Sequence, residues 1–396
     1  MPPARKILHL DLDAFFCAVE EQRDPMLVGK PFAVGGRPES RGVVASCSYP
    51  ARRFGVHSAM PMSQAVRLCP GLIIVPARHG AYSAVSRQVM AILHALTPLV
   101  EQISIDEAFL DVSDRPEEAE HVARELQARI RSELHLPCSL GVASNKLVAK
   151  IANNEGKAQA RGEGPPNAIK VVAPGQEAAF LDPLPCDALW GVGPKTAERL
   201  RELGMETIGD IVRWPEADLF RRFGKNGYDF ARHARGLDDR PIVTEHERKS
   251  VSQETTFERD VSDGEALRRT LRQQAGDVSR VLKTKRLAGA TVKLKLRWPD
   301  FTTITRQVTL PAPTDDGPTI AAAALQLFDR EWSERGNPKA VRLIGVGVSG
   351  FRANLGQRTL FDQPDEREER LDAAMQALRA RFGPQAIRRA SDLDEQ

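Results

Sequence analysis

Two adjacent carboxylates, Asp106 and Glu107, interrupt the otherwise apolar stretch QISIDEAFLDVSD at residues 102–114. Like charges side by side repel each other, and in a partly buried place they also lose hydration, which is costly unless something pairs with them. The pair alone leaves two interpretations open. The carboxylates lie either in a solvated turn between two short strands or in a binding site for a cation.

Two further carboxylates follow the first predicted strand. The stretch KILHLDLD at residues 6–13 has the apolar side chains of a strand and ends on Asp11 and Asp13. Residues 14–76 are expected to be an insertion that is mostly helical and rich in turns. A helix begins at His79, where apolar side chains recur at helical spacing.

The remaining elements complete a known order. Strands at residues 99–105 and 107–113 form a hairpin, an amphipathic helix is opened by Pro116, and a strand at residues 138–144 precedes a helix from Asn145. The order β, insertion, α, β, β, α, β is the split βαβ, ferredoxin-like pattern, so the predicted fold class is α+β.

This topology brings the carboxylates together. The first and third strands are central antiparallel neighbours, so the end of one lies beside the start of the other, and Asp11, Asp106 and Glu107 meet at one edge of the sheet. Such a cluster needs a cation, and all-oxygen ligands suit Mg²⁺ or Mn²⁺. Two ions bridged by shared carboxylates can activate a hydroxyl and stabilise a leaving pyrophosphate.

The composition sets outer limits. A chain of 396 residues is too long to fold around a single ordinary hydrophobic core, so we expect two to four domains. Its contents of 41% hydrophobic and 28% charged residues are typical of soluble globular proteins. No apolar stretch approaches the roughly 18 residues that span a membrane, and the N-terminus does not resemble a secretory signal. The cysteines are dispersed without CxxC spacing, which favours free thiols in a reducing cytosol over disulfides or a zinc site. They are Cys17, Cys47, Cys69, Cys138 and Cys186.

Positive charge is concentrated in the last third of the chain. The net charge is only +3, but residues 248–353 contain nineteen Lys and Arg side chains against twelve Asp and Glu. The alternating stretches VKLKLRW and TITRQVTL predict half-exposed strands, with Lys293, Lys295 and Arg297 on one face. A basic sheet face indicates a polyanionic partner, and a merely well-solvated domain is the alternative.

A helix-hairpin-helix is predicted at residues 189–204, LWGVGPKTAERLRELG. The turn between Gly191 and Gly193 presents backbone N–H groups, with Lys195 close by, to a phosphodiester. The alternative is a helical hairpin that only packs.

Four stretches, taken in their order and spacing, resemble the Y-family DNA polymerases of the DNA polymerase IV type: DLDAFFCAVEE, SYPARRFGV, SIDEAFLDVS and GVASNKLVAKIA. The resemblance covers about residues 6–361. It implies a right-handed polymerase with a ferredoxin-like palm, small fingers, a helix-hairpin-helix thumb and an α+β little finger. The implied domains are the palm (1–13 and 77–172), fingers (14–76), thumb (173–240), linker (241–250), little finger (251–354), and a clamp-binding peptide with a C-terminal helix (355–396).

The resemblance also implies site residues. Asp11 and Asp106 bridge two Mg²⁺ ions, which Mn²⁺ can replace, Glu107 holds the ion that lowers the pKa of the primer 3′-hydroxyl, and the Leu12 carbonyl reaches the other ion. The triphosphate is bound by the side chains of Ser46, Tyr49 and Arg52, by Lys157, and by the backbone N–H groups of Phe15 and Phe16. Arg suits this task because it can bind two oxygens at once.

Phe16 matches the steric gate of the family. A bulky ring under the sugar would clash with a 2′-hydroxyl and so exclude ribonucleotides. Taken as one residue, it could equally be an ordinary core Phe at the start of a helix.

Two departures from the family pattern stand out. The family usually has Lys-Pro-Asn/Asp-Gly after the helix from Asn145, whereas here an insertion separates Lys157 from Pro166, and Ala168 replaces the Gly. Lys150 is the poorer candidate for the triphosphate lysine. Pro50 follows Tyr49 where the family more often has Glu, and we expect it to keep Tyr49 extended.

The tail contains GQRTLF, which resembles the peptide by which bacterial polymerases bind the sliding clamp. Leu360 and Phe361 would fill an apolar cleft, and Gln357 would make a polar contact at its edge. The alternative is an apolar anchor for the helix predicted after it.

These features predict a template-directed DNA polymerase for translesion synthesis, a nucleotidyltransferase that adds dNTPs to a primer with low fidelity and without proofreading. Its partners would be primer–template DNA, dNTP and the sliding clamp, without a membrane, and it would act as a monomer in the cytoplasm. Two alternatives are a catalytically inactive assembly factor that only binds DNA and clamp, and a nucleotidyl cyclase, which shares the split βαβ core.

Overall fold

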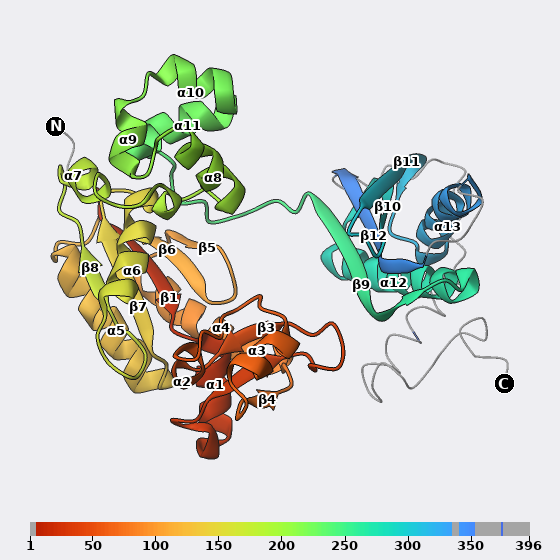
Figure 1. Cartoon of the computed structure of the whole chain (residues 1–396), viewed down its shortest axis with the longest axis horizontal. Coiled ribbons are helices and arrows are strands. Elements are labelled where there is room, and N and C mark those ends of the chain that lie inside the picture. Colours follow the sequence, from red (N-terminus) through yellow and green to blue (C-terminus); the bar gives the residue numbers. More distant parts are fainter. Residues whose placement is uncertain (1–4, 335–339, 353–373, 375–396) are drawn as a thin grey trace. The chain divides into compact units, whose positions relative to one another are not determined.

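The computed structural model describes residues 5–334, 340–352 and 374, which belong to two compact units, Met1–His246 and Glu247–Gln396 (Figure 1). The predicted clamp peptide, Gln357 to Phe361, and the helix predicted beyond it lie outside the described residues. None of the described helices has the length and apolar composition that crossing a bilayer requires.

A five-stranded sheet with the order β5-β6-β1-β7-β8 organises the first unit. Strand β1 pairs antiparallel with both β6 and β7, and β8 is added parallel to β7. This order confirms the split βαβ prediction. The elements are β1 (Ile7–Leu12), α4 (His79–Leu96), β5 (Val100–Gln102), β6 (Glu107–Asp111), α5 (Ala119–Leu134), β7 (Cys138–Ala143), α6 (Lys146–Gln159) and β8 (Ile169–Val171).

The two faces of this sheet pack against different helices. Leu8, Leu10 and Leu12 of β1 join the core formed with α4 and α5, whereas Ile7 joins the core that contains α6 (Figure 1). Because side chains alternate along a strand, His9 and Asp11 share the face of Ile7 and so lie toward α6. Helix α6 begins where Asn145 caps it, accepting a hydrogen bond of 3.0 Å from the Val148 N–H.

The insertion after β1 differs from its prediction. It contains a three-stranded sheet, β3-β2-β4, as well as helices. Strands of three or four residues are too short to show an alternating pattern, so they could not be predicted from the sequence. The elements are α1 (Phe15–Arg23), η1 (Pro25–Leu27), β2 (Phe32–Gly35), β3 (Val44–Cys47), α2 (Tyr49–Arg52), α3 (Met62–Leu68) and β4 (Ile73–Val75).

Two helix predictions also need correction. Helix α5 begins at Ala119 and not at Pro116, because Glu118 is still extended. The first helix of the predicted helix-hairpin-helix is a single 3-10 turn, η2. The helical elements that follow the sheet are α7 (Glu177–Leu181), η2 (Cys186–Ala188), α8 (Pro194–Glu202), α9 (Ile208–Arg213), α10 (Glu216–Phe223) and α11 (Lys225–Ala234).

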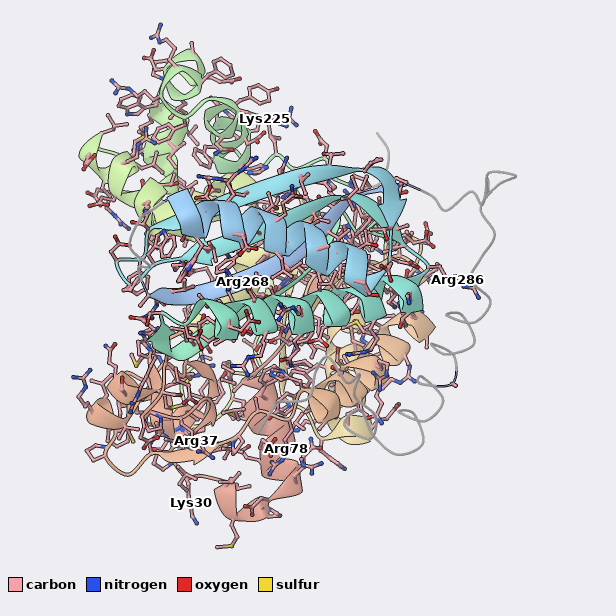
Figure 2. The ribbon with its side chains drawn as sticks, turned by 90° about the vertical axis from the view of Figure 1, so that its right-hand side faces the viewer. Lys30, Arg37, Arg78, Lys225, Arg268 and Arg286 are labelled. Carbon is pink, nitrogen blue, oxygen red and sulfur yellow. The ribbon has the colours of Figure 1, made fainter. Side chains whose placement is uncertain are left out.

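The second unit is a four-stranded sheet, β11-β10-β12-β9, with two helices packed on one face. Figure 2 shows both helices and labels Arg268 on α12 and Arg286, the residue that directly follows it. On β10, Val292, Leu294 and Leu296 are buried against the helices, and Lys293, Lys295 and Arg297 share the other face, as predicted. The elements are β9 (Ser250–Val261), α12 (Gly264–Lys285), β10 (Ala288–Arg297), β11 (Thr303–Thr314), α13 (Gly317–Glu334) and β12 (Val341–Arg352).

Candidate active site

A pocket of about 450 Å³ opens at the end of β1 in the first unit. Nine of the residues predicted for metal or nucleotide binding line it. The lining residues are Asp11, Leu12, Ala14, Phe15, Phe16, Ala45, Ser46, Tyr49, Arg52, Ser58, Asp106, Lys157, Ala158 and Pro166. The structure therefore brings together residues that are far apart in the sequence.

The strand register places the predicted carboxylates side by side. Asp11 on β1 is the direct partner of Glu107 on β6, and the Leu12 N–H donates a hydrogen bond of 3.0 Å to the Asp106 carbonyl. Ser104 shapes the kink before β6, where its hydroxyl donates to Asp106 Oδ1 at 2.5 Å and accepts from the Glu107 N–H at 3.0 Å. Asp106 thus lines the pocket, whereas Glu107, its neighbour, does not, and neither residue lies in a freely solvated turn.

Asp11 is paired with a lysine from α6. Lys157 Nζ lies 2.5 Å from Asp11 Oδ1 and 3.2 Å from Asp13 Oδ1. Burial raises the pKa of Asp11 to about 7, against the opposing effect of Lys157, and the charges of Glu107 and Asp106 raise it further. Burial therefore makes ionisation of Asp11 costly even though Lys157 lies beside it.

Glu107 is paired with a second lysine of the same helix. Lys150 Nζ lies 2.7 Å from Glu107 Oε2, and His9 Nε2 lies 3.8 Å from that oxygen, beyond hydrogen-bond length. His9 and Lys150 lower the pKa of Glu107. Burial lowers the pKa of His9 itself to about 4, so its ring is neutral and accepts a hydrogen bond of 2.9 Å from Asn153 Nδ2.

These contacts decide how the carboxylates could hold a cation. Across the described ranges, no group of three or more His, Cys, Asp or Glu side chains is arranged to hold a metal ion. Lys157 and Lys150 take up the oxygens of Asp11 and Glu107 instead. The donor set nevertheless fits a hard divalent ion, because it consists of carboxylate oxygens, among them those of the buried Asp11.

The predicted triphosphate side chains lie across the pocket on β3 and α2. Ser48 caps α2, accepting a hydrogen bond of 3.4 Å from the Ala51 N–H, and the Arg52 guanidinium stacks 4.9 Å from the centre of the Tyr49 ring. The prediction that Pro50 keeps Tyr49 extended is wrong, since Tyr49 is the first residue of α2. Proline is tolerated there because the first N–H groups of a helix have no partner within it.

Phe16 is half-buried at the start of α1 and lines the pocket. Its ring stacks on the buried Tyr82, with ring centres 4.1 Å apart and planes 12° apart. His79 meets the Phe16 ring edge-on at 6.2 Å. Phe16 therefore packs against the core on one side and lines the pocket on the other, and its assignment as the gate stays a prediction.

The chain's relatives are enzymes of one kind. Residues 10–154 match the model of the impB/mucB/samB family, residues 248–360 its C-terminal domain, and residues 174–205 the IMS family HHH motif. A protein named DNA polymerase IV from Listeria monocytogenes serotype 4b (strain CLIP80459) is 43% identical over 355 residues, which are 89% of this chain and 97% of that protein. Another DNA polymerase IV, from Desulfatibacillum aliphaticivorans, is 40% identical over 392 residues, 97% of this chain and 96% of its own.

The solved structure of a Y-family DNA polymerase chimera, Dbh-Dpo4(243-245)-Dbh, matches with a TM-score of 0.79 and 25% identity, covering 88% of this chain and all of its own. The chain belongs to the Y family of DNA polymerases. Within it the chain is of the DNA polymerase IV type, as the sequence motifs indicated. Y-family polymerases depend on metal ions, which agrees with the carboxylates at the pocket.

None of the predicted DNA contacts of this Y-family polymerase is among the residues that line the pocket. Gly191 has a positive φ of 101°, which favours glycine, and Gly193 precedes α8, which begins with Pro194 and Lys195. The predicted basic residues of β10 belong to the second unit. For both sets, binding to DNA stays a prediction.

Sequence reasoning named Lys157 and Lys150 only as candidates for binding the triphosphate and missed that one face of α6 contacts the carboxylates. Lys150, Asn153 and Lys157 contact His9, Glu107 or Asp11, and Lys146 pairs with the buried Glu101 at 2.7 Å. The spacing of these four polar residues, at intervals of four, three and four, places them on one helix face. This polar stripe was the signal that the sequence offered. On its own it is also compatible with a helix face exposed to solvent.

Proposed function

We propose that this Y-family polymerase copies damaged DNA templates, adding dNTPs to a primer 3′-hydroxyl at the pocket between β1, β6 and α1. The observation that carries the proposal is the register of β1 and β6, which sets Asp11 opposite Glu107 beside Asp106 at a pocket lined by the predicted triphosphate residues.

Asp11, Asp106, Glu107 and the Leu12 carbonyl would hold two Mg²⁺ ions, or Mn²⁺ in their place. Bound there, the ions would lower the pKa of the primer hydroxyl and neutralise the leaving pyrophosphate. Asp11 and Glu107 would exchange the ammonium groups of Lys157 and Lys150 for these ions. A divalent charge beside Asp11 would offset the cost of ionising this buried carboxylate.

The triphosphate would be bound from two sides. Ser46, Tyr49 and Arg52 line one side, and Lys157 lies on α6 at the other. The first N–H groups of α1, at Phe15 and Phe16, have no partner within the helix and favour an anion. The Phe16 ring, fixed by Tyr82, would exclude a 2′-hydroxyl by contact.

The small insertion after β1 supports a tolerant site, because a small lid restrains the nascent base pair weakly. We therefore propose low fidelity without proofreading. The duplex would be held through backbone phosphates by the Gly191–Gly193 turn, Lys195 and the basic face of β10, so binding should weaken steeply with salt.

Primer extension with Mg²⁺ on an undamaged and a lesion-containing template tests the proposal, comparing the parent with Asp106→Ala. The parent should extend both primers, and Asp106→Ala should lose at least about a hundredfold in rate. Asp111→Asn is the control, because Asp111 lies at the far end of β6 from the pocket. An inactive parent that still binds DNA would contradict the proposal and indicate an assembly factor.

We also propose that Gln357, Leu360 and Phe361 bind the sliding clamp. Deleting residues 357–361 should abolish stimulation of synthesis by the clamp and leave distributive synthesis intact. Stimulation that survives the deletion would overturn this docking.

A further inference from the structure

A fully buried carboxylate, Asp13, lies directly after β1 and has no part in the chemistry proposed above. Its side chain is 0% exposed. Ser139 Oγ donates to its two oxygens at 3.0 and 2.9 Å, the Asn167 N–H donates to Oδ2 at 3.0 Å, and Lys157 Nζ lies 3.2 Å from Oδ1. A buried carboxylate is costly unless its oxygens are satisfied, and these donors satisfy both.

The partners of Asp13 come from both sides of the insertion that interrupts the family motif. Lys157 lies in the last turn of α6, and the loop then runs from Ala160 to Asn167 before the chain enters β8. Asp13 contacts the last lysine before the loop, Lys157, and the backbone N–H of the last loop residue, Asn167. One carboxylate thus contacts both the Lys and the Asn of the motif that the insertion divides.

The far end of the loop is fixed independently of its length. Asn167 adopts a left-handed φ of 44°, its carbonyl accepts from Gln127 at 3.1 Å, and the Ala168 N–H donates to Ser139 Oγ at 3.0 Å. The Ala168 carbonyl accepts from the Leu140 N–H at 2.8 Å. Asp13, Ser139 and the turn at residues 167–168 therefore form one hydrogen-bonded unit on β7.

The ammonium group of Lys157 needs a partner that fixes its position. Lysine is a point charge on a flexible stem, so its position depends on the groups that bind its ammonium. In the structure those groups are Asp11 and Asp13. Since Asp11 is proposed to bind metal ions, Asp13 is the carboxylate that can stay with Lys157 when a triphosphate arrives.

We propose that Asp13 is a positioning residue that holds the Lys157 ammonium at the triphosphate side of the pocket, and that it lets this chain keep a working triphosphate site despite the insertion. This inference rests on the proposed role of Lys157. A structural anchor for the turn at residues 167–168 is the competing explanation, and the experiment has to separate the two.

The test is a double-mutant cycle of Asp13→Asn with Lys157→Ala, read as the KM for dNTP and as the inhibition constant of inorganic tripolyphosphate. Asn can keep the hydrogen bonds to Asn167 and Ser139 while removing the charge. We expect Asp13→Asn to raise both constants about five- to tenfold in the parent, with kcat less affected, and by less than about twofold in the Lys157→Ala background.

Two controls separate positioning from folding. Asp111→Asn removes a partly buried carboxylate of the same sheet that accepts from Ser113 and Arg5, and it should change the melting temperature without changing either constant. If Asp13→Asn does not fold, Ser139→Ala replaces it in the cycle, because it removes the hydroxyl that orients both Asp13 oxygens.

The outcomes are distinct. The inference would be overturned if Asp13→Asn raised the KM for dNTP and the inhibition constant of tripolyphosphate equally in the parent and in Lys157→Ala. It would also be overturned if Asp13→Asn raised neither constant in the parent. If Lys157→Ala leaves both constants unchanged, the proposed role of Lys157 is wrong and the inference about Asp13 falls with it, while primer extension by the parent still reports on the polymerase itself.

Discussion

Lys150 Nζ lies 2.7 Å from Glu107 Oε2, so a carboxylate predicted to hold a metal ion is paired with an ammonium from α6. About two turns further along the same face of α6, Lys157 pairs in the same way with Asp11. Without such partners, the like charges of Asp11, Asp106 and Glu107 would repel one another at the pocket. The helix therefore supplies the positive charge that keeps the carboxylates together in the absence of metal ions.

The raised pKa of Asp11 predicts a specific dependence of stability on pH. Burial moves this pKa from 3.8 to about 7, so the folded state binds the proton more tightly than the unfolded state does. The stability from that proton is complete below about pH 4 and is lost as the pH rises to about 7. Asp11→Asn should not lose stability in this way, because the Asn side chain does not titrate.

Urea unfolding of the metal-free protein in EDTA measures how the free energy of unfolding depends on pH. The stability gain of Asp11→Asn over the parent should be about 2 kcal/mol larger at pH 8 than at pH 5. Asp210→Asn on α9 is the control: hydrogen bonds from Thr207 lower the pKa of Asp210, so its titration lies below the ordinary value of 3.8 and its effect should be constant over this range. A gain for Asp11→Asn that does not grow with pH would contradict the account.

Phe16→Ala should relax the exclusion of ribonucleotides. Removing the ring that stacks on Tyr82 leaves space where a 2′-hydroxyl would lie, so the preference for dNTP over rNTP should fall by at least about tenfold. Single-nucleotide incorporation with matched dNTP and rNTP measures this ratio. Phe54→Ala, which removes an exposed Phe of the same insertion, should leave it unchanged, and an unaltered ratio in Phe16→Ala would remove the gate assignment.

Much of this site could be predicted from the sequence. The periodicity of α4 and the alternation in β1 and β10 fixed the element types, and element order alone implied that Asp11 would meet Glu107. The reason is that strand order in a split βαβ unit is strongly constrained. The end of the first strand therefore lies beside the start of the third, and the carboxylates at these positions become neighbours.

Other features depend on packing that the sequence does not display. The short strands β2, β3 and β4 carry too few residues for a pattern, and Pro50 was compatible with either a turn or the first turn of α2. The contacts of Asp13 could not be predicted because its partners, Ser139 and Asn167, become neighbours only when β1, β7 and the loop after α6 come together.

Lys293→Ala should weaken DNA binding almost equally for all sequences. Lys293 is exposed on the open face of β10, where a phosphate contact would release counterions. The slope of log affinity against log salt should fall by about 1 relative to the parent. Lys285→Ala removes the same charge from α12, on the other side of the sheet, and should not change the slope; equal effects of both variants would contradict a phosphate contact by β10.

The central claim is that Asp11, Asp106 and Glu107 hold the catalytic ions. Electron paramagnetic resonance can count Mn²⁺ bound by the full chain with primer–template DNA and a non-hydrolysable dNTP analogue. The account predicts two Mn²⁺ ions per chain in the parent and fewer in Asp106→Ala, with the analogue retained by the triphosphate residues. Unchanged Mn²⁺ binding in Asp106→Ala, or none in the parent, would contradict it.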